Sequence, residues 1–206
     1  MEILFIIRAD AQRNLGGDTI QMLKTKAALE ELDLTVEVRG TDELERLPAC
    51  DLAHVFNIQT ADSSWAAFEA LQKKGIPTVL SSIYWDMLDH WFDFAVDSRF
   101  YWRWLAQLLG KVRARQIYTG WQRRKASSTQ EWQTQRRLLE QAIRVLPNSQ
   151  SEGDLLQKHL LSTALFSKKL MWCLTELKLI CLTLPLNPAN SFWKNMVCAI
   201  LCWKSG

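Results

Sequence analysis

The sequence has few of the residues that would indicate a secreted, metal-binding or membrane-spanning protein. Of its five cysteines, Cys50 alone occurs in the first 170 of 206 residues. The terminal pair, Cys198 and Cys202, is followed by no second pair and no histidine, so we expect no metal site. No uncharged apolar run approaches the roughly 18 residues of a membrane-spanning helix, and the first apolar run is too short for a signal peptide. We therefore expect a reduced protein in the cytoplasm.

Acidic residues are absent from one long stretch, which is rich in aromatic residues and contains eight basic ones: Arg99, Arg103, Lys111, Arg113, Arg115, Arg123, Arg124 and Lys125. Basic residues interleaved with Trp and Tyr suit the interface of an anionic membrane. We expect this stretch to meet the inner face of a membrane through Arg99, Arg103, Trp102, Lys111, Arg113 and Arg115. One alternative is an insert whose aromatic residues pack on the rest of the protein while its cations are solvated. The other is nucleic acid, for which no recognition motif occurs, so we expect no nucleic-acid partner.

The first 33 residues predict a strand, a loop and a helix. Residues 3–7 are a continuous apolar run, as in a strand that is buried on both faces of a parallel sheet. Gly16 and Gly17 precede a segment with apolar residues at helical spacing. Glycines at a helix start allow close approach of a ligand, and the free N–H groups there favour an anion such as a phosphate. The alternative is a plain tight turn, since the G-x-G-x-x-G pattern is absent.

The rest of the chain alternates strands with helices as far as residue 160. Strands are predicted over residues 34–38, 52–56, 77–80 and 142–146, and helices over 63–74 and 153–159. A helical, basic and aromatic insert is expected over 87–140. This alternation predicts an α/β fold with a parallel sheet. Ligands of such sheets bind at the carboxyl ends of the strands. That rule groups Gly16 and Gly17 with Asn57 and with the turn Tyr84-Trp85-Asp86.

Four segments in series resemble the N-terminal domain of the family-four retaining glycosyltransferases. They are Gly16-Gly17-Asp18-Thr19 with its helix, the run from Asp51 to Asn57, Pro77-Thr78-Val79-Leu80, and Val145-Leu146-Pro147-Asn148-Ser149. The resemblance covers residues 1–160 and implies a Rossmann-like domain, the acceptor-binding half of a two-domain enzyme of the GT-B type. It implies that Gly16 and Gly17 lie near the diphosphate of a nucleotide-sugar donor, and that Asn57, Tyr84 and Trp85 contact the acceptor. No cofactor besides this donor substrate is implied.

The catalytic residue that the resemblance implies is Asp86. Many relatives have a His-Asp pair after the fourth strand, whereas this chain has Trp85-Asp86, so that only the aspartate matches. Asp86 is therefore the candidate general base. Its alternative role is to cap the helix that is expected to start at Met87.

Residues 161–206 differ in composition from the rest of the chain and match nothing in that family. Read in a shifted frame, Met171-Trp172-Cys173 gives two successive valine codons, and a string resembling the family's entry into its donor-binding domain follows. We expect a frameshifted and poorly packed tail in a truncated chain that is inactive alone. The alternative is a genuine, divergent tail.

These observations predict a glycosyltransferase fragment that acts on a nucleotide sugar and a glycan or lipid-linked acceptor. The alternative function is a stand-alone nucleotide- or phosphate-binding module without catalysis. Both would use the same glycine loop, so the loop alone does not separate them.

Overall fold

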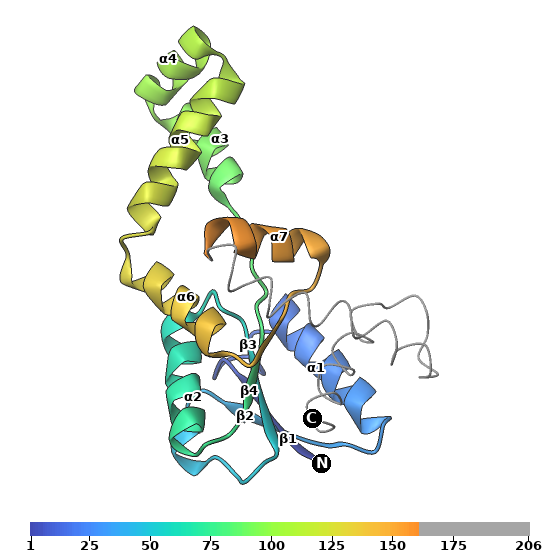
Figure 1. Cartoon of the computed structure of the whole chain (residues 1–206). Coiled ribbons are helices and arrows are strands. Elements are labelled where there is room, and N and C mark those ends of the chain that lie inside the picture. Colours follow the sequence, from blue (N-terminus) through green and yellow to red (C-terminus); the bar gives the residue numbers. More distant parts are fainter. Residues whose placement is uncertain (161–206) are drawn as a thin grey trace. The chain divides into compact units, whose positions relative to one another are not determined.

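A five-stranded parallel sheet forms the centre of the protein, in a computed structural model that describes residues 1–160 (Figure 1). The expected tail, residues 161–206, lies outside the described part. Along the sheet the strands follow the order β2-β1-β3-β4-β5. Their bounds are β1 Glu2–Ile7, β2 Thr35–Gly40, β3 Leu52–Phe56, β4 Thr78–Ser81 and β5 Arg144–Leu146. The predicted parallel α/β fold is thereby confirmed, and it is Rossmann-like in its general architecture.

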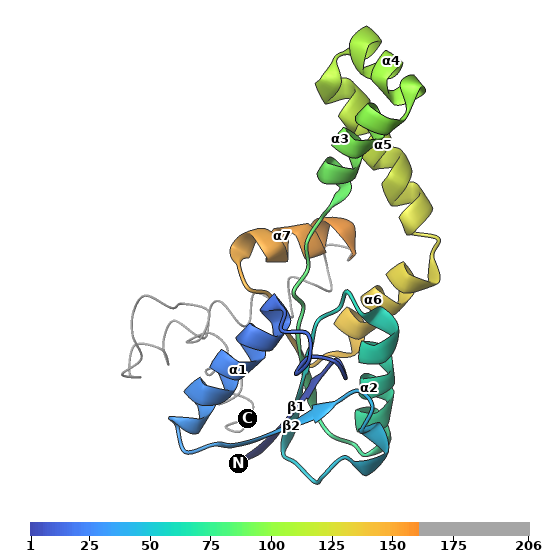
Figure 2. The same cartoon turned by 180° about the vertical axis from the view of Figure 1, so that it is seen from behind.

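Helices connect the strands and cover both faces of the sheet. The helices are α1 Gly17–Glu30, the 3-10 turn η1 Leu44–Arg46, α2 Ala61–Lys73, α3 Leu88–Ser98, α4 Phe100–Leu109, α5 Lys111–Ala126, α6 Gln130–Gln141 and α7 Gln150–His159. α1 lies on one face, and α2 and α6 lie on the other (Figures 1 and 2). Crossovers between parallel strands are right-handed. The chain moves in one direction along the sheet after β1 and in the opposite direction after β3, so the two crossovers cover opposite faces.

The core lies around the two central strands. All five residues of β3 are buried, as are residues 3–7 of β1. Such continuous apolar strands are expected where helices cover both faces. By contrast, β2 lies at the sheet edge and is mostly half-exposed, which agrees with its alternating sequence. The expected strand over 142–146 begins only at Arg144, because the N–H of Ala142 still bonds to the carbonyl of Leu138 in a last helical turn.

Gly75 ends α2. Its φ of +68° is left-handed, a conformation that glycine adopts without a steric penalty. The Gly75 N–H bonds to the carbonyl of Gln72 at 2.9 Å, and the Ile76 N–H bonds to that of Leu71 at 3.0 Å. Together these two bonds close the helix and direct the chain into β4.

The chain divides into two compact units. We call residues 1–84 and 134–160 the sheet unit, and residues 85–133 the helical unit. The helical unit contains α3, α4 and α5, whose buried side chains form its own small core: Phe92, Ala95, Trp102, Ala114 and Tyr118. Within residues 1–160, no helix combines the length and the apolar character needed to cross a bilayer.

Candidate functional site

The carboxyl edge of the sheet has a topological switch point between β1 and β3. From β1 the chain passes through a loop into α1 on one face, and from β3 it passes through Asn57 into α2 on the other face. The two loops diverge there, and such a switch point is the usual ligand position in an open parallel sheet. Gly16, Gly17 and Asn57 all belong to these loops, so the sheet brings three of the predicted site residues to one place.

A buried carboxylate stands at the start of α1. Asp18 is 6% exposed, and its Oδ2 accepts a 2.8 Å hydrogen bond from Arg8 Nε and a 3.4 Å bond from Asn57 Nδ2. Its Oδ1 accepts from the N–H of Thr19 at 2.8 Å. Burial alone would raise the pKa of Asp18, but these bonds together hold that pKa below its ordinary value. Asp18 therefore stays ionised and ties the β1 loop to the β3 loop.

The two glycines of the loop differ in their surroundings. A Cβ on Gly16 would lie 2.6 Å from Asp18 Oδ1 and 3.0 Å from a guanidinium nitrogen of Arg8, so the Arg8–Asp18 pair itself requires glycine there. A Cβ on Gly17 would meet no atom within 4 Å, and Gly17 is exposed at the first position of α1. Packing therefore explains Gly16 but not Gly17. Close approach of a ligand would explain Gly17.

Asn57 adopts a left-handed backbone with φ of 75°. Its Oδ1 accepts from the N–H of Gln59 at 2.8 Å, a local bond that makes this conformation accessible to asparagine. Its carbonyl accepts from Ser64 Oγ at 2.6 Å. Asn57 therefore shapes the β3 loop from within, and its predicted contact with an acceptor stays a prediction.

Glu152 of α7 fastens the segment that follows β4. It is 6% exposed, and its Oε1 accepts from Ser82 Oγ and, at 2.8 Å, from the N–H of Tyr84. Its Oε2 accepts from the N–H of Asn148 at 2.8 Å. Between Ser82 and Tyr84 lies Ile83 with φ of 47°, a costly conformation for a β-branched residue. One carboxylate thus holds a strained turn after β4 and the end of β5.

Sequence reasoning did not find Glu152, although part of a signal was there. Ser149 caps α7 by accepting a hydrogen bond from the N–H of Glu152 at 3.2 Å. A serine followed three residues later by glutamate is a capping-box signature. The signature announces the helix start, but it does not reveal that the same glutamate reaches Ser82 and Tyr84.

Tyr84 is placed by α7 at both of its polar ends. Besides the backbone bond to Glu152, its hydroxyl lies 3.3 Å from Nδ1 of His159, and the two rings meet edge to face. The predicted contact between Tyr84 and an acceptor would therefore occur beside α7, an element to which sequence reasoning assigned no site residue.

His54 is buried in the centre of β3. Its Nε2 lies 2.9 Å from Ser81 Oγ, and its ring stacks on Phe56 at 4.1 Å between centroids. Burial lowers the pKa of His54 to about 3, so the imidazole is neutral near neutral pH. With no exposed surface, it is a core residue and not a reachable base.

The remaining two site residues belong to the helical unit. Trp85 is 65% exposed. Asp86 Oδ1 accepts from the N–H of Leu88 at 2.9 Å, and its Oδ2 pairs with Arg123 at 3.1 Å. The bond to Leu88 agrees with the alternative role of Asp86 at the start of the helix. The cap residue itself is Met87, because α3 begins at Leu88. Its role as a general base stays a prediction.

The structure corrects one residue of the predicted membrane-facing set. Trp102 is 7% exposed, and its ring packs against that of Tyr118 at 5.0 Å. Residues four apart share one side of a helix, so Phe100 and Trp104 lie together on α4 while Trp102, midway between them, points to the opposite side. That opposite side faces the core of the helical unit.

The five cations of that set have partners within the helical unit or remain exposed. Lys111 and Arg115 pair with Asp93 of α3 at 3.0 and 3.3 Å. Arg103 donates to the carbonyl of Asp97 at 2.7 Å, and Arg99 donates to the hydroxyl of Tyr101 at 2.9 Å. Arg113 is exposed on α5. Three of these cations, Arg103, Lys111 and Arg115, therefore also connect the helices of the unit.

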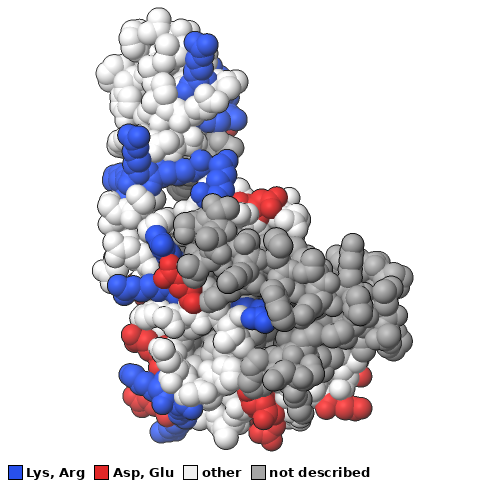
Figure 3. All heavy atoms as spheres, in the orientation of Figure 1, with Lys and Arg blue, Asp and Glu red and all other residues white. Residues whose placement is uncertain are grey.

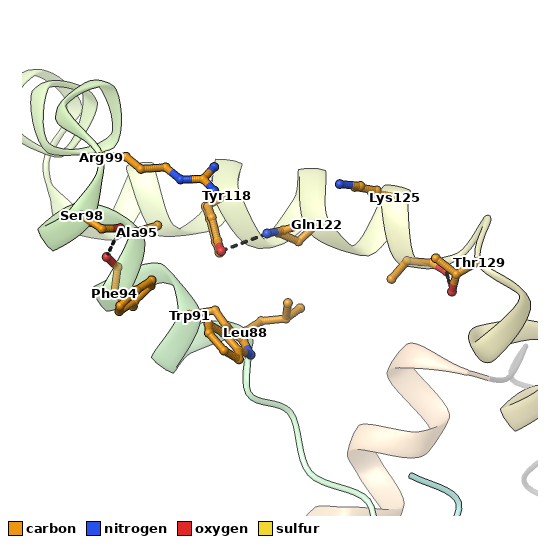
Figure 4. Close-up of a pocket in the computed structure, with 11 residues that line it drawn as sticks. Leu88, Trp91, Phe94, Ala95, Ser98, Arg99, Tyr118, Gln122, Lys125 and Thr129 are labelled. Carbon is orange, nitrogen blue, oxygen red and sulfur yellow. Dashed lines mark hydrogen bonds between the residues drawn. The ribbon is translucent and has the colours of Figure 1, made fainter. Parts of the chain in front are cut away.

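An open groove of about 470 Å³ lies between α3 and α5 (Figure 4). Leu88, Trp91 and Phe94 line it from α3, while Tyr118 and Gln122 face them from α5 and are joined by a 2.9 Å hydrogen bond. Two cations also line it: Arg99 and Lys125. Apolar walls with cations beside them would suit an apolar group that has an anionic end.

Among the described residues, no group of three or more His, Cys, Asp or Glu side chains is arranged to hold a metal ion.

Comparison with known proteins identifies no relative of this chain. No family model, no curated protein and no solved structure matches the chain.

Proposed function

We propose that the chain is the acceptor-binding half of a glycosyltransferase of the family-four retaining type. The observation that carries the proposal is the open position of Gly17 at the start of α1, at the switch point between the β1 and β3 loops. An exposed glycine that no packing requires, at the helix start beside a topological switch point, suits the approach of a phosphate group. The family resemblance of residues 1–160 supplies the identity of that group, the diphosphate of a nucleotide sugar.

In this proposal the protein supplies position and charge to the transfer. The backbone N–H groups at the start of α1 bind the diphosphate leaving group, while Asp18 keeps the two loops together through Arg8 and Asn57. Asn57 and Tyr84 contact the acceptor. Asp86 would take the acceptor's proton only after exchanging its bonds to Arg123 and Leu88.

The proposal includes a position at the cytoplasmic face of a membrane, since a lipid-linked acceptor would be presented there. In this proposal the donor-binding half is encoded by the shifted reading frame expected over residues 161–206. The chain by itself would then bind a donor weakly and transfer no sugar.

Titration calorimetry with a panel of nucleotide sugars and free nucleotides tests the proposal. We expect no transfer by the chain as given, and both tight donor binding and transfer by a longer protein made from the frame-restored gene. In that longer protein, Gly17→Ala should weaken donor binding by about tenfold, because a methyl group would stand where the phosphate approaches. Gly120→Ala is the matched control, as Gly120 also has no atom within 4 Å of its Cβ position and lies in a helix.

The alternative is a stand-alone nucleotide- or phosphate-binding module. The same loops favour it, because Gly16, Gly17 and Asn57 all lie in the sheet unit and need no second domain. Tight binding of a nucleotide by the chain as given, lost in Gly17→Ala and without transfer by the frame-restored protein, would replace the glycosyltransferase proposal with the module.

A further inference from the structure

The outer side of α4 carries an apolar stripe where a solvent-facing helix would carry polar residues. Phe100, Trp104 and Leu108 are 83%, 60% and 63% exposed, and their spacing of four residues aligns them along one side of the helix. The core of the helical unit is already filled from the opposite side by Trp102. A contiguous exposed apolar surface of this kind marks an interaction site. We call these three residues the α4 stripe.

Helices α4 and α5 carry charge of one sign. Helices α4 and α5 contain no acidic residue, and their seven basic residues are Arg103, Lys111, Arg113, Arg115, Arg123, Arg124 and Lys125. Asp93 and Asp86 of the same unit pair with Lys111, Arg115 and Arg123. Arg113, Arg124 and Lys125 are exposed on α5. On the face shown in Figure 3, the helical unit is blue and white with very little red. The unit therefore presents a positive potential together with an apolar stripe.

An anionic lipid surface matches both properties at once. Its headgroup region accepts aromatic rings and short apolar side chains, while its phosphates attract Lys and Arg. A second copy of the chain would satisfy the stripe but would bring two sets of these cations together, which is unfavourable. Nucleic acid would satisfy the cations, but its duplex backbone offers nothing to three apolar side chains on one helix side.

We propose that the helical unit docks on an anionic phospholipid bilayer, with the α4 stripe inserted among the headgroups and Arg113, Arg124 and Lys125 at the lipid phosphates. The surface is interfacial and non-spanning. This inference deepens the membrane position named in the proposed function, yet it does not depend on glycosyl transfer, since lipid binding is measured without any sugar.

Flotation of the full-length chain with vesicles tests this surface. One set of vesicles is phosphatidylcholine, and the other is phosphatidylcholine mixed with phosphatidylglycerol. We expect binding to the anionic set alone, weakening as salt rises. The variant Phe100→Ser/Trp104→Ser/Leu108→Ser and the variant Arg113→Gln/Arg124→Gln/Lys125→Gln should each bind at least about tenfold more weakly. Circular dichroism and thermal unfolding of both variants should match the unmodified protein, because all six side chains are exposed.

Matched controls come from the sheet unit. Leu15→Ser/Ile20→Ser/Leu23→Ser removes three exposed apolar residues there, and Lys24→Gln/Arg46→Gln/Lys73→Gln removes three exposed charges. Both controls should bind anionic vesicles like the unmodified protein. Equal binding to the two vesicle sets, binding to neither, or equal losses in the controls would overturn the proposal. An oligomer that dissociates in the stripe variant, or binding of single-stranded RNA in preference to vesicles, would overturn it too.

Discussion

Glu152 accepts a 2.8 Å hydrogen bond from the backbone N–H of Tyr84, 68 residues earlier in the chain. The same carboxylate accepts from Ser82 and from the N–H of Asn148. Replacing it with the neutral amide in Glu152→Gln exchanges one acceptor oxygen for an N–H₂ group that faces N–H donors. We expect a loss of about 2 kcal/mol in unfolding free energy, measured by urea denaturation of the full-length chain.

The control for that experiment is Glu131→Gln. Glu131 also lies in the first turn of a helix, α6, but it is exposed, so the substitution should change stability by no more than about 0.5 kcal/mol. Equal losses in the two variants would mean that Glu152 acts only through its charge at a helix start.

His54 predicts how stability depends on pH. Burial lowers the pKa of His54 to about 3 in the folded state, against 6.5 for a histidine in water. Between those two pH values His54 binds a proton in the unfolded chain but not in the folded one, so the unfolding free energy should fall as pH falls. Above pH 6.5 His54 is neutral in both states and this loss of stability is absent. The contribution at stake is of the order of 5 kcal/mol.

Urea denaturation at about pH 7 and about pH 5 measures this dependence. In His54→Gln, which cannot take up a proton, the stability difference between the two pH values should shrink. His90→Gln, which removes an exposed histidine of α3, should leave that difference as it is. An unchanged difference in His54→Gln would show that other groups cause the acid sensitivity.

Gly16 and Gly17 predict opposite changes in stability. Gly16→Ala forces a methyl group against Asp18 Oδ1 at 2.6 Å and should destabilise the protein by about 1–3 kcal/mol. Gly17→Ala places the methyl group in open space at a helical position and should stabilise it by up to about 1 kcal/mol. Thermal unfolding without ligand separates the two, and destabilisation by Gly17→Ala would mean that the glycine has a structural role.

Trp102 and Trp104 of α4 should differ in their contribution to stability, because the first is buried and the second is exposed. Trp102→Ala empties the core of the helical unit and should cost about 3–5 kcal/mol of that unit's stability. Trp104→Ala removes an exposed ring and should change stability by no more than about 0.5 kcal/mol. Limited proteolysis within residues 85–133 measures this directly, and equal protection in both variants would contradict the assigned core.

The sequence predicted the layers of this fold better than its contacts. Apolar runs identified β1 and β3, because this signal is local. Arg8, Asp18 and Glu152 were missed as connectors, since their partners lie in loops far along the chain and meet only when the sheet forms. The error at Trp102 could have been avoided from the sequence. Composition alone does not tell the two sides of a helix apart, whereas the four-residue spacing of Phe100, Trp104 and Leu108 places Trp102 on the other side.

The helical unit also has a consequence for the order of folding. Strands β4 and β5 are neighbours in the sheet, yet all of α3, α4, α5 and α6 separates them along the chain. Closing so long a loop costs more chain entropy than closing those between the other strand pairs, and β5 offers only three residues in return. We therefore infer that the sheet assembles from β1, β2, β3 and β4 first. Pairing of β5 completes it, and the Glu152 bonds, which need the end of β5 in place, form last.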